Sequence, residues 1–282
     1  MRRALTILLL LAPGLGLVIA LMGSVFYLAV MQSFGLMNFA GESALSLSYW
    51  QTMLAEPRYW RALQYSTYIA TTSSLLAVAL AYPLALLLRK PFRGSLLLSA
   101  LIKAPLLVPG LVAAFLFINV IAYHGVINEL MVRTGLWEKP IRMQNDANGY
   151  GVIFLQIWKQ MPFAFLLLSG AVQGLPEPVL LAARDLGAGT MARFRKIVLP
   201  LTANAMQASL ILIFIGAAGD FSFQAAAGPT SKHSLATLMS NLQGEQGDWN
   251  SAAVVAVTLM ALSLFGSAIL ALAVRGIQRL VR

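Results

Sequence analysis

Long apolar segments dominate the hydrophobic pattern of this chain. A bilayer core about 30 Å thick requires about 20 apolar residues per helix, and six segments of that size are bounded by charged or turn-forming residues. They are Leu5 to Val30, Leu63 to Leu88, Leu96 to Ala122, Gly151 to Leu175, Met206 to Phe223 and Ala252 to Val274. Gly216, Gly219 and Asp220 interrupt the far end of the fifth segment. The pattern predicts an all-α membrane protein with six transmembrane helices.

The start of the chain resembles a secretory signal peptide, because Arg2 and Arg3 precede an apolar run. The run continues to about Val30 and offers no convincing small-residue cleavage site. We therefore expect it to be retained as the first transmembrane helix.

The distribution of basic residues predicts the orientation. With six spans both termini lie on one side, and the cytoplasmic side is the one richer in Lys and Arg. The termini and the segments on their side hold twelve of the 20 Lys and Arg residues, and the other segments hold six, Arg142 among them. Both termini are therefore predicted to be cytoplasmic. The net charge of +10 reflects this topology, and anionic lipid head groups complement it, so no nucleic-acid partner is needed to explain it.

Composition narrows the chemistry further. The chain is 59% hydrophobic and 11% charged, and it contains no Cys, which excludes disulfides and thiolate metal sites. His124 and His233 stand alone, so we predict no metal site. No Gly-x-x-x-x-Gly-Lys-Ser/Thr loop is present, so any ATP hydrolysis must come from a separate subunit.

The segment 176–204, between the fourth and fifth spans, is long and amphipathic. Pro176 and Glu177 suit the start of a short helix, and Gly187 suits its end. A second stretch with alternating apolar and basic residues follows, until Pro200 opens the fifth span. A short amphipathic helix on the inner face is well suited to docking another protein.

This segment resembles the cytoplasmic loop of permease subunits in binding-protein-dependent, type I ATP-binding cassette importers. The resemblance rests on Ala182-Ala183, on Gly187 four residues later, and on Ile197, Leu199 and Pro200. In that family the loop forms a coupling helix that sits in a cleft of the ATPase. The resemblance implies ATPase-coupling roles for Leu181, Ala182, Ala183, Arg184, Asp185, Gly187, Ile197 and Pro200. Leu181 stands where the family motif has Glu, which puts one polar contact with the ATPase in doubt.

The resemblance covers most of the chain. Such permeases carry similar residues at the positions of Ser46 to Tyr68, Pro105, Pro109, Pro162-Phe163 and Gly219-Asp220-Phe221. Spermidine/putrescine-type permeases are the most similar subfamily. The family resemblance implies a single membrane domain with three parts. Residues 1–61 form the first helix and an outer loop, residues 62–274 form a five-helix permease core, and residues 275–282 form a basic tail.

The family resemblance also implies a set of partners and a location. These are two ATP-binding subunits that bind ATP and Mg, a second permease subunit expected to be a different chain, a periplasmic solute-binding protein and the lipid bilayer. The chain itself is not expected to be an enzyme or to bind a cofactor. Its expected location is the bacterial inner membrane. For segment 176–204, the alternative is a cytoplasmic connector of no special function. For the whole chain, the alternatives are a stand-alone secondary transporter, which would show inverted repeats, and a membrane enzyme, which would need a catalytic constellation.

Ionisable residues at bilayer depth are candidates for the solute path. Asp220 could attract a cationic amine, with Phe221 and Phe223 as aromatic faces and Gln224 nearby, or it could pair with a neighbouring helix for structure. Lys159, beside Trp158, could pair with Asp220. If Lys159 instead faces the path, it favours an anionic or zwitterionic solute, and phosphonate, opine, thiamine and iron permeases share much of the pattern. The charge of the solute therefore stays open, with a polyamine as the leading expectation.

Overall fold

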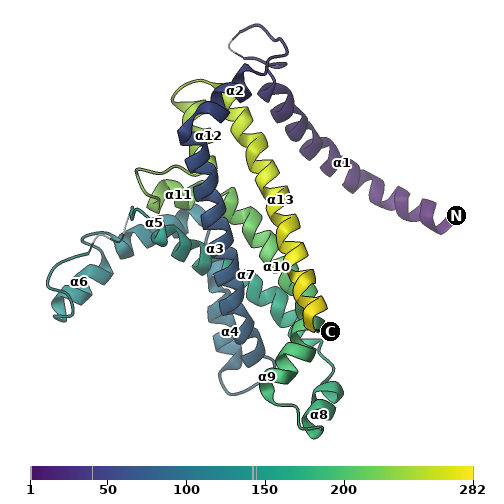
Figure 1. Ribbon diagram of the computed structural model, residues 1–282. Helices are drawn as coiled ribbons and strands as arrows, with labels where there is room; N and C mark the ends of the chain where they lie inside the picture. The colour runs from purple at the N-terminus through teal and green to yellow at the C-terminus, as the bar shows by residue number, and fades with distance from the viewer. Residues whose placement is uncertain (1, 40, 142, 144, 282) are drawn as a thin grey trace. The chain divides into compact units, whose positions relative to one another are not determined.

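The computed structural model describes residues 2–39, 41–141, 143 and 145–281 (Figure 1). Arg142 and Arg282, which contribute to the predicted charge asymmetry, lie outside the described residues. The chain forms two compact units. The first consists of Met1–Trp60 and Leu235–Ala261, and the second of Arg61–Ser234 and Leu262–Arg282.

The first unit contains two long helix segments and two short helices. It holds α1 (Arg2–Ser33), α2 (Ser48–Ala55), the first turn of α3 (Pro57–Leu87), α12 (Leu235–Gly244) and the beginning of α13 (Trp249–Val281). Side chains between Leu10 and Leu28 of α1 are exposed or half-buried, as expected for a helix that faces lipid. A hydrogen bond of 3.0 Å from the Asn250 side chain to the Gln32 carbonyl joins α13 to the end of α1.

The second unit is a bundle that contains the remaining helices. It holds most of α3, α4 (Ser95–Lys103), a 3-10 turn (Ala104–Leu107), α5 (Gly110–Ile121), α6 (Val126–Arg133), α7 (Tyr150–Gln173), α8 (Glu177–Asp185), α9 (Thr190–Arg193), a π-helical segment (Phe194–Val198), α10 (Leu199–Ala218), α11 (Ser222–Ala227) and the end of α13. Its larger core cluster joins α3, α7 and α10 through buried side chains such as Ala81, Phe165, Leu168 and Ile213. The helices α8 and α9 lie together at one end of this unit (Figure 1).

A glycine allows α13 to approach α10 closely within the second unit. A Cβ atom added at Gly266 would overlap the aromatic ring of Phe214, which is buried. Small residues at helix contacts commonly allow such close packing in membranes. The backbone of α13 therefore lies directly against this ring.

Six helical segments among the described residues are long and apolar enough to span a membrane. They are Leu10–Ser33, Pro57–Leu87, Gly110–Arg133, Tyr150–Gln173, Thr190–Ala218 and Trp249–Arg279. The prediction of six spans is thus confirmed, and the predicted first, second, fourth and sixth spans each lie largely within one of these helices. The segment between Gly125 and Asn148 contains the short helix α6.

The prediction of a continuous third span over Leu96 to Ala122 is wrong. The helix α4 ends at Lys103, a 3-10 turn follows, and α5 starts only at Gly110. Pro105 and Pro109 lack the N–H group that a helix requires, and Val108, which precedes a proline, adopts an extended conformation (φ −88°, ψ 121°). The apolar segment is therefore broken into two half-length helices.

The predicted bounds of the fifth span, Met206 to Phe223, are also wrong at both ends. Helical structure begins at Thr190, passes through the π-helical segment and ends at Ala218. A local π-helical turn is a common way to accommodate a disturbed hydrogen-bond ladder, and Pro200, which has no N–H, lies just after it. Gly219 and Asp220 then separate α10 from the short helix α11.

Candidate functional site

The predicted short helix in segment 176–204 is confirmed as α8. It starts after Pro176, with Glu177 in its first turn. At its end the Gly187 N–H bonds to the carbonyl of Arg184 and the Ala188 N–H to the carbonyl of Ala183, each at 2.9 Å. This is the Schellman arrangement, and Gly187 has the left-handed φ of +80° that it requires. Gly187 therefore fixes where the helix stops.

One face of α8 is open. Leu180 is its buried residue, and Ala183 is half-buried. The exposed residues include Leu181 (49% exposed), Ala182, Arg184 and Asp185, followed by Leu186 (88% exposed). The residue that departs from the family motif, Leu181, thus presents an apolar side chain on this open face. We call the exposed residues 181, 182, 184, 185 and 186 the α8 outer face.

The other two coupling candidates lie elsewhere. Ile197 and Pro200 are half-buried, and Ile197 packs against the larger core cluster of the second unit. Sequence reasoning grouped them with the α8 residues, whereas the structure separates them from the α8 outer face. Their contacts suit a role in fixing α9 and α10, since apolar burial stabilises that attachment.

An apolar groove lies where α8, α9, the π-helical segment and the end of α3 meet. Its volume is about 530 Å³, and it is lined by Leu86, Leu180, Thr190, Met191, Arg193, Phe194 and Val198. The ring of Phe194 packs edge-on against Tyr82 of α3 at 5.5 Å between ring centroids. The helix α8 is therefore attached along one side and open along the other.

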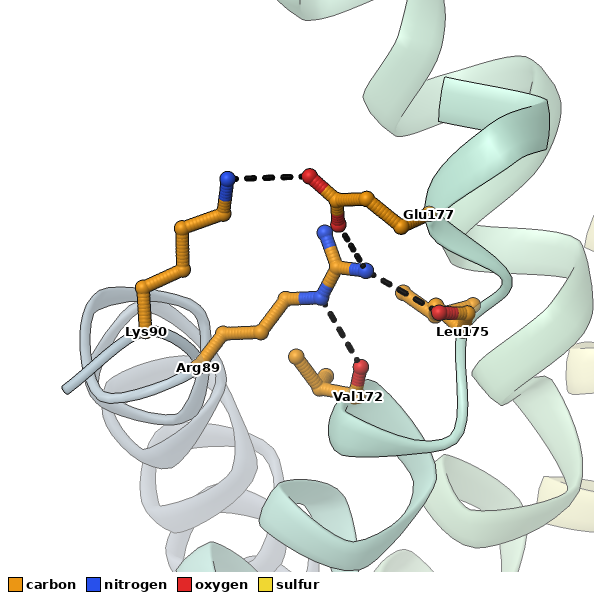
Figure 2. Close-up of polar contacts among 5 residues, drawn as sticks. All are labelled: Arg89, Lys90, Val172, Leu175 and Glu177. Atoms are coloured by element: carbon orange, nitrogen blue, oxygen red, sulfur yellow. Dashed lines mark hydrogen bonds and ion pairs between the residues drawn. The ribbon is translucent and has the colours of Figure 1, made fainter. Parts of the chain in front are cut away.

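Two basic residues at the end of α3 meet the start of α8 (Figure 2). The Arg89 guanidinium lies 2.8 Å from one carboxylate oxygen of Glu177, and the Lys90 ammonium lies 2.9 Å from the other. Arg89 also donates to the main-chain carbonyls of Val172 (3.2 Å) and Leu175 (3.0 Å) at the end of α7. Sequence reasoning missed this cluster. The available signal was that Glu177 is one of only two acidic residues expected on the basic inner side.

The same contacts control the ionisation of Glu177. The hydrogen bond from Lys90 is the largest effect and lowers the pKa of Glu177. Desolvation opposes it, and the positive charges of Arg89 and Lys90 act in the same direction as the hydrogen bond, so the pKa is lowered overall. Glu177 therefore stays ionised at neutral pH, and the cluster keeps its opposite charges.

The structure gives Asp220 a local partner. Its carboxylate accepts a 2.9 Å hydrogen bond from the N–H of Phe223, which is the usual way an acidic residue caps a helix, here α11. Phe221 is 47% exposed, whereas Phe223 and Gln224 are buried. The expectation that Phe223 offers an aromatic face to a solute is therefore wrong in this conformation, because its ring packs in a core cluster with Ile69.

The predicted pairing of Lys159 with Asp220 is wrong. The Lys159 ammonium instead donates to the carbonyl of Pro105 at 2.8 Å and to that of Val108, and it lies 3.5 Å from the carbonyl of Leu106. These carbonyls lie at the break in the third predicted span, where the regular helical ladder is interrupted and the Pro105 carbonyl also accepts a 3.3 Å hydrogen bond from the Val108 N–H. Trp158, next to Lys159, is half-buried and lines an apolar pocket between α5 and α7. Lys159 therefore satisfies a broken helix end, and the path candidates do not form one cluster.

Comparison with known proteins defines the family. The family described as "Binding-protein-dependent transport system inner membrane component" matches residues 73–280. The chain belongs to this family, whose members are membrane components of transport systems. The earlier resemblance to importer permeases is thereby confirmed.

The similar proteins with known names are transport permeases. The spermidine/putrescine transport system permease PotB of Escherichia coli is 30% identical over 171 residues, which covers 60% of this chain and 62% of PotB. The thiamine transport system permease ThiP of Brucella abortus is 33% identical over 161 residues, which covers 55% of this chain and 28% of ThiP. The chain thus spans about three fifths of the length of its PotB relatives.

A solved structure shows the same fold. A chain of a bacterial alginate transporter, in complex with an alginate-bound periplasmic protein, superposes with a TM-score of 0.77 at 14% identity, covering 95% of this chain and 93% of that one. At this identity the likeness extends to the fold alone. The type I importer permease fold expected from the sequence is thereby confirmed.

Proposed function

We propose that this chain is a permease subunit of an ATP-binding cassette importer and that α8 docks on a separate ATPase subunit. The observation that carries the proposal is the α8 outer face, which is exposed, partly apolar and held in place by the glycine stop at Gly187 in a chain of this family. Exposed apolar residues grouped on one helix face mark protein contacts. The sequence pattern placed this face on the cytoplasmic side, where an ATPase would meet it.

The proposed assembly contains three kinds of partner protein. Two ATPase subunits bind ATP and Mg, a second permease chain completes the path, and a periplasmic binding protein delivers the solute. The two permease chains lie in the bacterial inner membrane. The family description supports dependence on a binding protein. The alginate transporter with its bound periplasmic protein is a related assembly of the same fold. The six spans of this chain supply one half of such a path.

The proposed mechanism is alternating access. Closure of the paired ATPases on ATP draws the coupling helices together, and the bundle then opens outward to accept solute from the binding protein. Hydrolysis returns it to the inward-open state. In this scheme α8 carries the movement, and the chain itself performs no chemistry.

We propose a polyamine or a related amine as the solute, and similarity to PotB supports this choice. Thiamine is the second candidate, because ThiP is also similar. Asp220 is the carboxylate best placed to attract a cation, with the exposed ring of Phe221 beside it. Lys159 and Trp158, together with the buried Phe223 and Gln224, are reassigned to structural roles.

The test is a complete complex reconstituted in proteoliposomes with its binding protein. Labelled spermidine and labelled thiamine are offered separately, with and without ATP, and both uptake and ATP hydrolysis are measured. ATP-dependent spermidine uptake that saturating thiamine does not inhibit supports the proposal. Thiamine uptake alone reassigns the solute, and uptake without ATP contradicts the importer mechanism.

Two variants examine the residues in this system. Gly187→Trp is expected to uncouple hydrolysis from transport, because it disrupts the stop of α8. Asp220→Asn removes a charge but keeps a residue that caps helices well, so α11 should persist. Loss of amine uptake in an intact Asp220→Asn complex supports a path role, whereas unaffected uptake makes Asp220 structural.

A further inference from the structure

One guanidinium joins three helices at the predicted cytoplasmic end of the second unit. Arg89 lies just beyond α3, and its side chain is bonded to two carbonyls at the end of α7 and to the carboxylate of Glu177 at the start of α8 (Figure 2). The side chain of Arg89 is only 16% exposed, compared with 74% for Lys90, whose ammonium pairs with Glu177. Arg89 is therefore the inner member of the cluster, and Lys90 covers it from the solvent side.

The chemistry of the contacts requires arginine. The Val172 carbonyl lies in the last turn of α7 and also accepts a 3.3 Å hydrogen bond from the Leu175 N–H, and Leu175 lies two residues beyond the helix. The helix dipole favours a cation at this end. A planar guanidinium can donate to these two acceptors and to a carboxylate at the same time, whereas an ammonium is a compact charge without this fixed fork. A single residue thus satisfies the end of one helix and holds the start of the next.

A second attachment lies on the same face of α8. Leu180 follows Glu177 by three residues, a spacing that places both side chains on one face of a helix. Leu180 belongs to the core cluster that also contains Ala85 of α3 and Val172 of α7. The helix is therefore fixed to the bundle by an ionic contact at Glu177 and by an apolar contact at Leu180.

We propose that Arg89 and Glu177 form a mechanical link that carries displacement of α8 to the end of α3 and the end of α7. This inference rests on the proposed function and deepens it by naming positioning residues for coupling. When an ATPase subunit moves the outer face of α8, the link makes α3 follow instead of allowing α8 to pivot on Leu180. Glu177 and Arg89 touch neither solute nor nucleotide, so they act only through the helices that they join.

The experiment measures the coupling ratio, the number of ATP molecules hydrolysed per solute imported, in the reconstituted complex. Glu177→Lys places a cation against Arg89 and Lys90 and breaks the link, and Arg89→Lys keeps the charge but loses the fork. The free energy of a partly exposed ion pair corresponds to a factor of about two to five. We expect Glu177→Lys to raise the ratio by at least about that factor and Arg89→Lys to raise it less. The matched control is Arg93→Ala, which removes an exposed cation of the same loop and should keep the ratio of the parent.

Two further measurements keep the result interpretable. Co-purification of the ATPase subunit with each variant shows that the complex has assembled, and the double variant Arg89→Glu with Glu177→Lys restores opposite charges and should recover part of the coupling. An assembled Glu177→Lys complex with the ratio of the parent would overturn the link. If the parent complex itself shows no solute-stimulated hydrolysis, the proposed function fails instead, so the two failures are distinct.

Discussion

The ammonium of Lys159 on α7 donates a 2.8 Å hydrogen bond to the carbonyl oxygen of Pro105 in the turn that interrupts the third predicted span. A broken helix leaves carbonyl groups without N–H partners, and at bilayer depth water cannot replace them. Non-helical backbone is tolerated in a membrane protein when other groups satisfy it. Lys159 supplies hydrogen-bond donors to the break from a neighbouring helix, which explains why the break and a half-buried cation occur together.

Substitution of Lys159 should therefore destabilise the bundle. Lys159→Met retains most of the length of the side chain but removes the ammonium that donates to the carbonyls of Pro105 and Val108, and a lost hydrogen-bond partner costs about 1–3 kcal/mol. We expect a lower melting temperature for the detergent-solubilised protein, measured by the fluorescence of its tryptophans. Lys139→Met, which changes an exposed lysine in the outer segment, is the control and should melt like the parent. Equal melting of both variants would show that Lys159 does not support the break.

The contact between α10 and α13 gives a second prediction. Gly266→Leu forces a side chain into the space of the buried Phe214 ring, and overpacking of this kind costs about 1–3 kcal/mol. Gly276→Leu makes the same change on the same helix at a position with open space around it. We expect Gly266→Leu to reduce the yield of folded protein and its melting temperature, and Gly276→Leu to leave both unchanged. The reverse order would contradict the close approach of the two helices.

The left-handed conformation at Gly187 gives a third prediction. A β-branched residue is strained at this φ, and the left-handed conformation costs an L-residue about 1–2 kcal/mol, whereas Asn adopts it readily. Gly187→Val should therefore unwind the end of α8 and reduce the stimulation of ATP hydrolysis by the solute-loaded binding protein. Gly187→Asn should retain most of it. Equal stimulation in the two variants would show that the conformation at residue 187 does not control docking.

The ionisation of Glu177 gives a prediction about pH. Because its pKa is lowered from the ordinary value of 4.5, Glu177 gives a stabilisation that is fully present above that value and is lost only as the pH falls through the lowered pKa. Arg89 and Lys90 are the charged groups that face it. The coupling ratio of the parent should thus be constant from about pH 6 to about pH 8. A ratio that changes steadily across this interval would show that another group titrates at the link.

Local signals in the sequence were sufficient for much of the fold and for the candidate docking helix. Apolar length alone predicts the number of spans, and the glycine at residue 187 marks the end of α8. The break near Pro105 was not predictable from the sequence, since a proline can either kink or end a membrane helix. Here the helix ends, and Lys159 donates hydrogen bonds to the carbonyls at the break. The contact of Arg89 with Glu177 was also missed, because it depends on where α3 ends and where α8 begins, and these points are far apart in the sequence. In the sequence, Arg89 contributes only to the excess of basic residues on the predicted cytoplasmic side.

The central claim is that the outer face of α8 docks on an ATPase subunit. A photo-crosslinking amino acid, benzoyl-phenylalanine, placed at Leu181 or at Lys139 in the assembled complex tests it most directly. Both positions are exposed, so both should tolerate the probe. The account predicts a crosslink to the ATPase subunit from position 181 and none from position 139. A complex that hydrolyses ATP but crosslinks to the ATPase only from position 139, or from neither position, would contradict it.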